Sequence, residues 1–510
     1  MANYYISGAA TNGKPLGNDA NNGETVSTPW LSLSKVVDLP SGTHDIYIND
    51  DVGCTEQAIT SNNRNVTIHD WSGTKPTLTG FASNYLIYAS GATGIIIFAD
   101  PFVFDCVNTG STALVIQQHS SGGNTVTVPD GCEFINTSGL SQIIWVRSST
   151  GTAAHTITVG ACTVEDGSGI TRYFTIEDLK TGTLTVDGFD FGDQTGATGN
   201  NYGFELKAQN EGSTGQITIR NLKGTISGSG SGTTFGVSGI DVDNVLVETG
   251  DFTVKNTGSG LVAGVRLDGT TAGIGAVARN NDIAISAGTG YGVIIGSDSA
   301  ASSADGGEIY GNTIVGIDSP NSLHGVMQGF NANGVMYENH ISYCGLPVIT
   351  KQSTNVEAYG NTSDYLVESA GGVTDGMRMK GATGANFHDN TVIIRVGYEG
   401  NGLTADWDNP TVNTGGLYTN NLVDVKSGVD MAAAGKLLVA VGSGSDASAA
   451  TFSGNTYWFN GEAFPADMFS YQGTLYADID AWNASPYASD EKSTITPSGD
   501  PRWTDYDSAV

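Results

Sequence analysis

Asn312-Thr313-Ile314 is the clearest copy of a short phrase that recurs through the second half of this chain of 510 residues. The copies begin at Asn281, Asn312, Asn339, Asn361, Asn390, Asn421 and Asn455, with steps of 31, 27, 22, 29, 31 and 34 residues. A persistent period of about 30 residues is typical of solenoids, in which each coil covers the core of its neighbour. Asparagine suits such a turn because it tolerates the left-handed backbone region, and its amide can bond to the equivalent amide one coil away.

Short segments in which apolar and polar residues alternate, as in strands, continue before this region, although the Asn-Thr-Ile phrase is no longer recognisable there. They are Val66–Ile68, Ile95–Phe98, Val126–Val128, Thr156–Val159, Leu184–Val186, Ile217–Ile219 and Val245–Val247. The composition agrees, since 71 residues are glycine and only 14% are charged, which favours short strands and tight turns over helices. The sequence therefore predicts an all-β chain of about 14 coils.

Single chains with coils of this length resemble the right-handed parallel β-helix proteins, which include polysaccharide lyases, glycoside hydrolases and phage tailspikes. We therefore expect a single-stranded, right-handed parallel β-helix over residues 51–455, with caps at 1–50 and 456–510. Thr28-Pro29-Trp30 and the apolar residues that follow predict a short amphipathic helix in the N-terminal cap. The aromatic residues from Tyr457 to Trp482 predict the C-terminal cap.

The cysteines follow the same period. Cys106, Cys132 and Cys162 each come just after a strand, at steps of 26 and 30 residues, and Cys54 lies two such steps before Cys106. The total of five is odd, which excludes a complete disulfide framework. We interpret these residues as a ladder of small buried thiols.

The net charge of −31 restricts the partners of this chain. Such a surface repels nucleic acid and anionic membranes, and no apolar run approaches the roughly 18 residues of a membrane span. Residues 1–8 have neither a basic n-region nor an apolar h-region, which fits a secreted protein whose signal was removed or a virion protein released by lysis. We expect an extracellular or virion-associated protein with no nucleic-acid and no membrane partner.

A β-helix binds long polymers along one sheet, because equivalent outward side chains line up from coil to coil. The strands that begin the C-terminal coils align as Gly264–Gly269, Gly292–Ser297, Gly325–Phe330, Pro347–Gln352 and Gly376–Gly381. If the second and fourth positions of each strand face the core, the third and fifth face solvent. The outward set then contains Arg266, Asp268, Lys351, Arg378 and Lys380.

Three cations on two adjacent coils are notable in a chain with only 21 lysines and arginines. Lys351 and Lys380 would lie about one strand spacing apart, where each disfavours the charge of the other, so one neutral amine could serve as a base. Arg378 would stay charged and could clamp a carboxylate. Such a group suits β-elimination on a uronic-acid polymer, which needs an anion-stabilising cation, a base for the C5 proton and an acid for the leaving oxygen. An ordinary solvated basic patch is the alternative.

Three segments resemble the catalytic region of polysaccharide lyase family 6, the alginate lyases and chondroitinase B: Lys351–Asn355, Asn361-Thr362 and Gly376–Gly381. The resemblance covers about 30 residues and implies Lys351 as the Brønsted base and Arg378 as the acid. It departs from the family where Arg-His-Gly is replaced by Arg378-Met-Lys-Gly.

The family also implies a cofactor, calcium, which neutralises the substrate carboxylate and is held by acidic side chains on preceding coils. The matching positions here are Ile294, Gly296, Met327 and Gly329, so the ligand spacing does not support calcium. Lys380 or Arg266 would have to replace it.

Three histidines flank the same coils and could assist the reaction. His324 is a candidate for proton transfer, and His340 and His388 are candidates, with Arg266 and Asp268, for binding the substrate. Solvated turn histidines are the alternative. We find no Ser-His-Asp elbow, phosphate loop, zinc spacing or dinucleotide fingerprint in the sequence.

Three hypotheses follow, each with a polysaccharide as partner. The leading one is a lyase of an acidic, uronate-containing polysaccharide. The second is a glycoside hydrolase or tailspike-type depolymerase that uses aspartate pairs, and the third is a non-catalytic adhesin or fibre. The candidate pairs are Asp187 with Asp190 and Asp193, Asp241 with Asp243, and Asp406 with Asp408. The protein would be a monomer, or a homotrimer if it is a tailspike.

Overall fold

The computed structural model describes most of the chain. The described residues are 2–8, 13–49, 52–54, 57–60, 64–80, 83–90, 94–107, 109–117, 123–147, 154–165, 169–177, 179, 182–193, 198–207, 215–240, 242, 244–268, 275–297, 305–317, 323–368, 374–406, 411–442, 449–459 and 464–494. They divide into two compact units, Met1–Val277 and Ala278–Val510, and each is a parallel β-solenoid with three sheets, A, B and C.

The first unit contains eight or more strands in each sheet among its described residues. Sheet A contains β1 (Ala2–Ser7), β2 (Gly42–Asn49), β5 (Arg64–Asp70), β8 (Gly94–Phe98), β11 (Asn124–Val128), β14 (His155–Val159), β17 (Gly182–Asp187), β20 (Gln216–Arg220) and β23 (Val245–Glu248). Sheet B contains β3 (Val52–Cys54), β6 (Thr77–Gly80), β9 (Val103–Asp105), β12 (Cys132–Ile135), β15 (Cys162–Val164), β18 (Asp190–Asp193), β21 (Lys223–Gly228) and β24 (Asp251–Asn256). Sheet C contains β4 (Gln57–Thr60), β7 (Ser83–Ser90), β10 (Thr109–Gln117), β13 (Gln142–Arg147), β16 (Arg172–Glu177), β19 (Asn201–Lys207), β22 (Thr234–Ile240) and β25 (Val262–Asp268).

The second unit repeats the arrangement. Sheet A contains β26 (Val277–Arg279), β29 (Glu308–Tyr310), β32 (Val335–Tyr337), β35 (Glu357–Tyr359), β38 (Asn386–His388), β41 (Gly416–Thr419), β44 (Ala450–Ser453) and β48 (Ala488–Ser489). Sheet B contains β27 (Asp282–Ser286), β30 (Thr313–Gly316), β33 (His340–Ser342), β36 (Thr362–Asp364), β39 (Thr391–Ile394), β42 (Leu422–Val425), β45 (Thr456–Phe459) and β49 (Lys492–Thr494). Sheet C contains β28 (Gly290–Gly296), β31 (Leu323–Gly329), β34 (Leu346–Lys351), β37 (Asp375–Lys380), β40 (Asn401–Asp406), β43 (Val439–Val441), β46 (Phe469–Tyr471) and β47 (Thr474–Tyr476).

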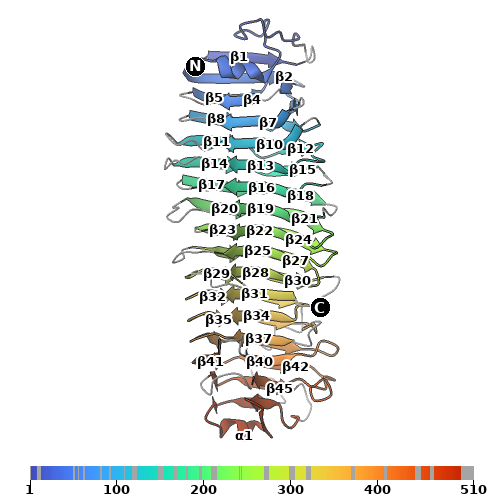
Figure 1. Cartoon of the computed structure of the whole chain (residues 1–510), viewed down its shortest axis with the longest axis vertical. Helices are drawn as coiled ribbons and strands as arrows, with labels where there is room; N and C mark the ends of the chain where they lie inside the picture. The colour runs from blue at the N-terminus through green and yellow to red at the C-terminus, as the bar shows by residue number, and fades with distance from the viewer. Residues whose placement is uncertain are drawn as a thin grey trace. The chain divides into compact units, whose positions relative to one another are not determined.

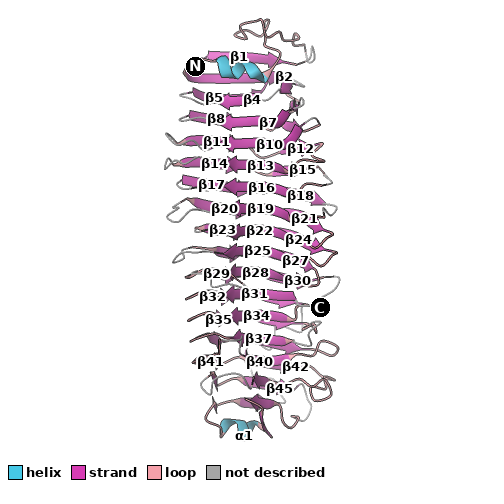
Figure 2. Ribbon diagram, viewed as in Figure 1, coloured by secondary structure: helices cyan, strands magenta, loops and turns pink. Residues whose placement is uncertain are grey.

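Within each unit the chain visits sheets A, B and C in turn, and strands pair in parallel with the strand one coil away, except that β46 and β47 form an antiparallel pair (Figure 1). Strands dominate both units, and the described helices are two short ones, η1 (Leu33–Asp38) and α1 (Ile479–Asn483) (Figure 2). The predicted parallel β-helix is therefore confirmed, with small differences in the number of coils and in the form of the cap. None of the described helices is long and apolar enough to span a bilayer.

Side-chain alternation builds the core. In β14, His155, Ile157 and Val159 are buried while the two threonines between them are exposed, as the period of two in a strand requires. Equivalent inward residues stack from coil to coil, for example Phe104 on Phe134, with ring centroids 4.8 Å apart. Each buried residue of this kind contributes about 1.5–3 kcal/mol, so a long apolar column holds each unit together.

The N-terminal cap differs from the prediction. The helix η1 is a 3-10 helix that starts at Leu33, and Ser32 at its N-cap makes no side-chain capping bond. Thr28, the expected N-cap, instead bonds through its hydroxyl to the Thr25 hydroxyl at 2.7 Å and belongs to a turn. The helix still buries Leu33 and Val36.

At the other end of the chain, aromatic residues enter the core. Trp482 on α1 is fully buried and stacks on Phe469, with ring centroids 5.5 Å apart. The Asp478 side chain caps α1 by accepting a hydrogen bond from the Ala481 amide at 2.8 Å.

The cysteine ladder is only partly as predicted. Cys132 and Cys162 are register partners on β12 and β15, and both thiols are free and buried. Cys106 is also buried, but it is out of register with them, because β12 pairs with β9 so that Phe104 faces Phe134. Burial raises the pKa of the Cys106 thiol far above its usual range, which suits a structural role. The side chain of Cys54 lies outside the described residues.

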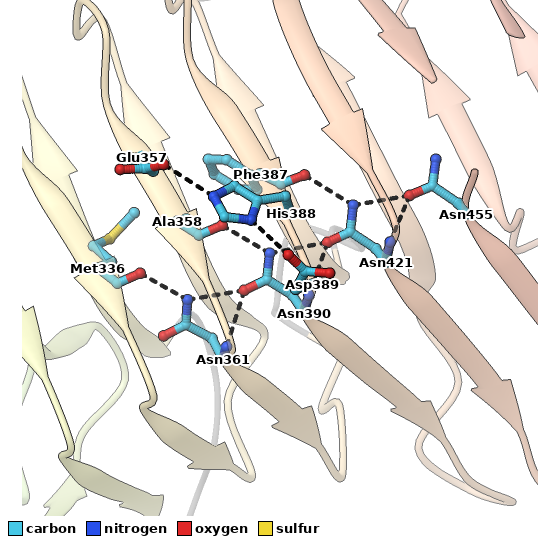
Figure 3. A network of polar contacts seen from close by, with 10 residues as sticks. All are labelled: Met336, Glu357, Ala358, Asn361, Phe387, His388, Asp389, Asn390, Asn421 and Asn455. Carbon is cyan, nitrogen blue, oxygen red and sulfur yellow. Dashed lines mark hydrogen bonds and ion pairs between the residues drawn. The ribbon is translucent and has the colours of Figure 1, made fainter. Parts of the chain in front are cut away.

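The asparagines of the repeat form a continuous ladder through the second unit. Each Oδ1 accepts from both the backbone N–H and the Nδ2 of the preceding asparagine; for Asn361 and Asn390 these distances are 3.0 and 2.9 Å (Figure 3). The Asn390 Nδ2 also donates to the Ala358 carbonyl at 2.9 Å. The predicted amide stacking is therefore confirmed, and every ladder asparagine is at most 1% exposed.

The left-handed residue at this turn is not the one predicted. It is the residue before each ladder asparagine, such as Asp389 with φ 54° and Asn420 with φ 56°. The ladder asparagine is placed instead so that its amide points inward to its neighbours.

Candidate functional site

A row of charged residues ends the strands of sheet C in the second unit. Lys351 on β34 is the register partner of Lys380 on β37, as the alignment of coils predicted, and Lys380 is the register partner of Asp406 on β40. Gln352 and Gly381 follow the two lysines with φ of 47° and 62°, so the chain turns sharply there and the lysines are the last strand residues. We call Lys351, Lys380 and Asp406 the charged row.

The outer face of the sheet is more enclosed than predicted. A Cβ atom added to Gly416, on sheet A, would lie 2.7 Å from the Met379 sulfur, so the Met379 side chain points into the core. Because side chains alternate along a strand, the neighbouring Arg378 points outward. Arg378 is nevertheless 93% buried, and its partner Ile349 is only 1% exposed. The third position of these strands therefore faces outward but is covered, while the lysines at the fifth position are half-buried.

Arg378 bridges two carboxylates. Its Nη1 donates to Asp375 Oδ2 at 2.9 Å and its Nη2 to Asp406 Oδ2 at 2.6 Å. Asp375 is fixed in turn by Asn401 Nδ2 at 2.8 Å and by the Thr404 hydroxyl at 3.0 Å. The side chains of Arg378 and Asp375 are 8% and 2% exposed, whereas that of Asp406 is 30% exposed.

These ion pairs argue against the acid role that the family resemblance gave to Arg378. Both terminal nitrogens already donate to carboxylates in a buried setting, and a guanidinium gives up a proton only at very high pH. Arg378 instead holds the Asp406 carboxylate from a buried position.

Sequence reasoning missed Asp375 and the partnership of Asp406 with Lys380. Extending the alignment by one coil, from Gly376–Gly381 to Gly402–Asp406, would have placed Asp406 opposite Lys380. Asp375 lies three residues before Arg378, a spacing that in a strand does not by itself indicate an ion pair.

The three candidate histidines lie on three different sheets. His324 is on β31 of sheet C, where its ring edge packs on Tyr291 at 4.9 Å between centroids. His324 lies five residues before Gly329, the register partner of Lys351, which corresponds to about 16 Å along the strand. His324 is thus too far from the charged row for direct proton transfer.

The other two histidines do not share the face of the charged row. His340 is exposed on β33 of sheet B. His388, on β38 of sheet A, bonds to Glu357 at 3.0 Å and to Asp389 at 2.8 Å (Figure 3). Burial lowers the pKa of His388, but the bonds to Asp389 and Glu357 outweigh it and raise the pKa above its usual value.

Arg266 and Asp268, the remaining candidates, lie on β25 of sheet C in the first unit. Arg266 Nη2 is 3.7 Å from Asp268 Oδ2, and the guanidinium lies over the Phe235 ring, 5.8 Å from its centroid. Their side chains are 24% and 17% exposed, so both are accessible to a ligand.

Sheet C has a different charge balance from the other sheets. In the second unit the described strands of sheet C carry three Lys or Arg residues and two Asp or Glu residues. Those of sheet A carry one cation and two acids, and those of sheet B carry one cation and three acids. In the first unit the described strands of sheet C carry four cations and three acids. Those of sheet A carry two cations and four acids, and those of sheet B carry two cations and five acids. In each unit, sheet C is therefore the sheet on which a polyanion meets least repulsion.

The residues of this site do not fit calcium. Ile294 and Met327, at the positions that the family uses for ligands, are apolar and at most 1% exposed, and Gly296 and Gly329 supply no side-chain oxygen. Within the described ranges, no group of three or more His, Cys, Asp or Glu side chains is arranged to hold a metal ion. We derive no step through calcium.

The three described aspartates of the first predicted group lie on two strands. Asp187 ends β17 of sheet A and pairs with Arg220 at 2.8 Å, whereas Asp190 begins β18 of sheet B and accepts from the Gly192 amide at 2.9 Å. Asp193 ends β18, so it also lies on sheet B. Asp241, Asp243 and Asp408 lie outside the described residues.

Comparisons with known proteins found neither a matching family model nor a matching curated protein. Among solved structures, the chain is similar to a mutant tailspike protein of E. coli bacteriophage HK620 in complex with a pentasaccharide, at 12% identity over 89% of this chain and 72% of that chain, with a TM-score of 0.33. It is also similar to the GH136 lacto-N-biosidase of Eubacterium ramulus, at 11% identity over 89% and 67%, with a TM-score of 0.31. A third is XylC in complex with xylose, at 10% identity over 92% and 85%, with a TM-score of 0.22. Likenesses this weak carry no argument about function, which must come from the residues of this chain.

Proposed function

We propose that the protein binds an acidic, uronate-containing polysaccharide along the outer face of sheet C and cleaves it by β-elimination at the charged row of the second unit. The observation that carries this proposal is the register of Lys351, Lys380 and Asp406 on three successive coils. Because neighbouring strands are about 4.8 Å apart, two amines and one carboxylate lie within reach of a single sugar linkage.

The order of the row suggests a separate role for each lysine. Asp406 is the register partner of Lys380, whereas Lys351 is one coil farther from that carboxylate. Lys351 in its neutral form takes the C5 proton of the uronate, and the electron pair released forms the C4–C5 double bond as the bond from C4 to the leaving oxygen breaks. Lys380 pairs with the substrate carboxylate and gives its proton to the leaving oxygen.

Arg378 and Asp375 support this arrangement without touching the substrate. Arg378 fixes Asp406, and Asp375, with its Asn401 and Thr404 contacts, fixes Arg378. The same buried position argues against hydrolysis by Asp375 and Asp406 as a carboxylate pair, because the Asp375 side chain is only 2% exposed. The net charge of −31 and the polymer substrate favour action outside the cell or on a virion.

The test is cleavage of a panel of polyuronates, followed by the ultraviolet absorbance of the unsaturated sugar ends. We expect Lys351→Ala to lower the rate at least about 100-fold, as loss of a general base does. Lys255→Ala, on β24 of sheet B, is the matched control and should leave the rate unchanged.

Three results would overturn the proposal. New reducing ends without unsaturation would indicate a hydrolase instead. Binding without any product, unaffected by Lys351→Ala, would indicate an adhesin or fibre. A Lys351→Ala variant with full lyase activity would remove the charged row from the reaction.

A further inference from the structure

A hollow of about 480 Å³ lies in the N-terminal part of the first unit. The residues that line it are Gly13, Lys14, Pro15, Val26, Ser27 and Trp71. Its volume falls within the range of about 300–1,000 Å³ that small-ligand pockets occupy. The proposed active site does not use any of these residues.

Trp71 forms one wall and is held rigidly. Its amide donates to the Ile48 carbonyl of β2 at 2.7 Å, so the end of β5 is fixed to the neighbouring strand. The preceding Asp70 accepts hydrogen bonds from the Ser72 hydroxyl at 2.6 Å and the Gly73 amide at 2.9 Å, which closes the turn after Trp71. These bonds fix the backbone that carries the indole, so the position of Trp71 in the wall is set by the sheet.

Other aromatic rings support Trp71 on the outer face of sheet A. Tyr5 lies 5.0 Å from the Trp71 ring at an angle of 60°, and Tyr5 stacks on Tyr47 at 5.3 Å. Tyr47 stacks in turn on His69 at 4.9 Å. These rings are register partners on β1, β2 and β5, so the sheet itself sets their spacing.

The opposite wall is a short, closed turn. The Thr25 hydroxyl bonds to the hydroxyls of Ser27 at 3.1 Å and Thr28 at 2.7 Å. This turn presents Val26, which is 50% exposed, and the Ser27 hydroxyl beside the hollow. A ligand between the walls would meet an indole, an exposed apolar side chain and a hydroxyl.

Lys14 adds a cation to the site. Its ammonium lies over the Trp71 ring, 5.3 Å from the centroid, which is where the apolar face of a ligand would stack. An exposed cation–π contact is weak, so a ligand can displace the ammonium from the ring and then bind it through oxygen atoms. These groups match a pyranose ring that carries a carboxylate. The aromatic and aliphatic side chains fit the apolar face of the ring, the hydroxyl can bond to its hydroxyls, and the ammonium can pair with its carboxylate.

We infer that this hollow is a second carbohydrate site, which holds one uronate ring of the polysaccharide against Trp71 with its carboxylate on Lys14. The substrate class rests on the proposed function. The residues of this hollow take no part in the proposed cleavage.

The test measures the binding of oligouronates and of their carboxyl-reduced counterparts by calorimetry, in a full-length Lys351→Ala background that does not cleave them. We expect Trp71→Ala to weaken oligouronate binding at this site at least about tenfold and Trp71→Phe to retain most of it. Lys14→Gln should weaken oligouronate binding about tenfold and leave the binding of the reduced sugars unchanged. Lys35→Gln is the matched control, because Lys35 is a half-buried lysine paired with Asp38 and does not line the hollow.

The inference is overturned if Trp71→Ala, with unchanged thermal stability, binds oligouronates as tightly as the parent. It is also overturned if Lys14→Gln has no effect, since the carboxylate contact would then be absent. The two proposals fail separately: oligouronate binding that depends on Trp71, without unsaturated products from the wild-type protein, would refute the lyase and keep this site.

Discussion

The two units stabilise the turn from sheet A to sheet B with different side chains. In the second unit the residue that begins each sheet B segment is a ladder asparagine, and its amide bonds to the coils on both sides. In the first unit the equivalent positions include Cys132, Cys162, Phe189, Leu222 and Gly250, and the first four are fully buried. Either an amide chain or apolar packing can therefore set the spacing of coils.

The difference explains why the repeat is visible only in the second half of the sequence. An amide ladder requires an asparagine on every coil, because one missing member leaves its neighbours without partners. Apolar packing tolerates exchange among residues of similar size, so the first unit keeps its coils although the Asn-Thr-Ile phrase does not recur there.

The largest effect should come from breaking the ladder with Asn390→Leu. This change removes the acceptor for the Asn361 backbone N–H and Nδ2 and the donor to the Ala358 carbonyl, all in buried positions. We expect the free energy of unfolding to fall by about 4 kcal/mol, measured by urea denaturation.

Asn386→Leu is the matched control for this prediction. Asn386 lies on β38 of the same coil, is half-buried, and its Oδ1 has no hydrogen-bond partner among the described atoms. It should cost less than about 1 kcal/mol. Equal losses for the two variants would show that the ladder has no special role.

A smaller, pH-dependent effect is expected where the ladder ends. Glu491 takes the place of the next asparagine: its Oε1 accepts from the Asn455 backbone N–H at 3.0 Å and Nδ2 at 2.9 Å, and its Oε2 accepts from the Tyr457 hydroxyl at 2.6 Å. Burial raises the pKa of Glu491 from 4.5 to about 7 despite these bonds. The folded state therefore holds the proton more tightly than the unfolded state.

The sign of the pH dependence follows from this shift. The contribution of Glu491 is fully present below about pH 4.5 and is lost as the pH rises towards about 7. Its size is of the order of 3 kcal/mol. In Glu491→Gln this dependence should disappear, which urea denaturation at several pH values can measure; a difference between the two proteins that stays constant from pH 4 to 8 would contradict the account.

The smallest effect belongs to the first unit. Cys132→Ala removes a buried sulfur from apolar packing beside Cys162, with no hydrogen-bonded ladder to interrupt. We expect a loss of about 1 kcal/mol in the free energy of unfolding and unchanged cleavage of polyuronates. A loss as large as that of Asn390→Leu would mean that the thiol pair sets the coil spacing here as the amides do in the second unit.

The sequence predicts features that repeat on every coil. The period of the asparagines and the alignment of the strands that begin at Pro347 and Gly376 are sufficient to pair Lys351 with Lys380, because the side chains of a parallel sheet follow a strict register. The amide stacking follows from the same repeat.

Features that depend on a single coil escape prediction. Arg378 is buried between Asp375 and Asp406, and no periodic pattern indicates which outward side chains pair with each other. His324, His340 and His388 lie within 65 residues of the sequence but on three sheets, because their spacings of 16 and 48 residues are not whole multiples of the unequal coil lengths. The position of η1 likewise depends on the turn that Thr25 and Thr28 close.

The central claim is that an acidic polysaccharide lies on the charged row of sheet C, and chemical footprinting of lysines tests it most directly. Acetylation of each lysine would be measured by mass spectrometry with and without a polyuronate, in a Lys14→Gln, Trp71→Ala background that lacks the N-terminal site. We predict that Lys351 and Lys380 become protected, whereas Lys492 on β49 of sheet B reacts equally in both conditions. Protection of Lys492 with continued reaction of Lys351 and Lys380 would contradict the account.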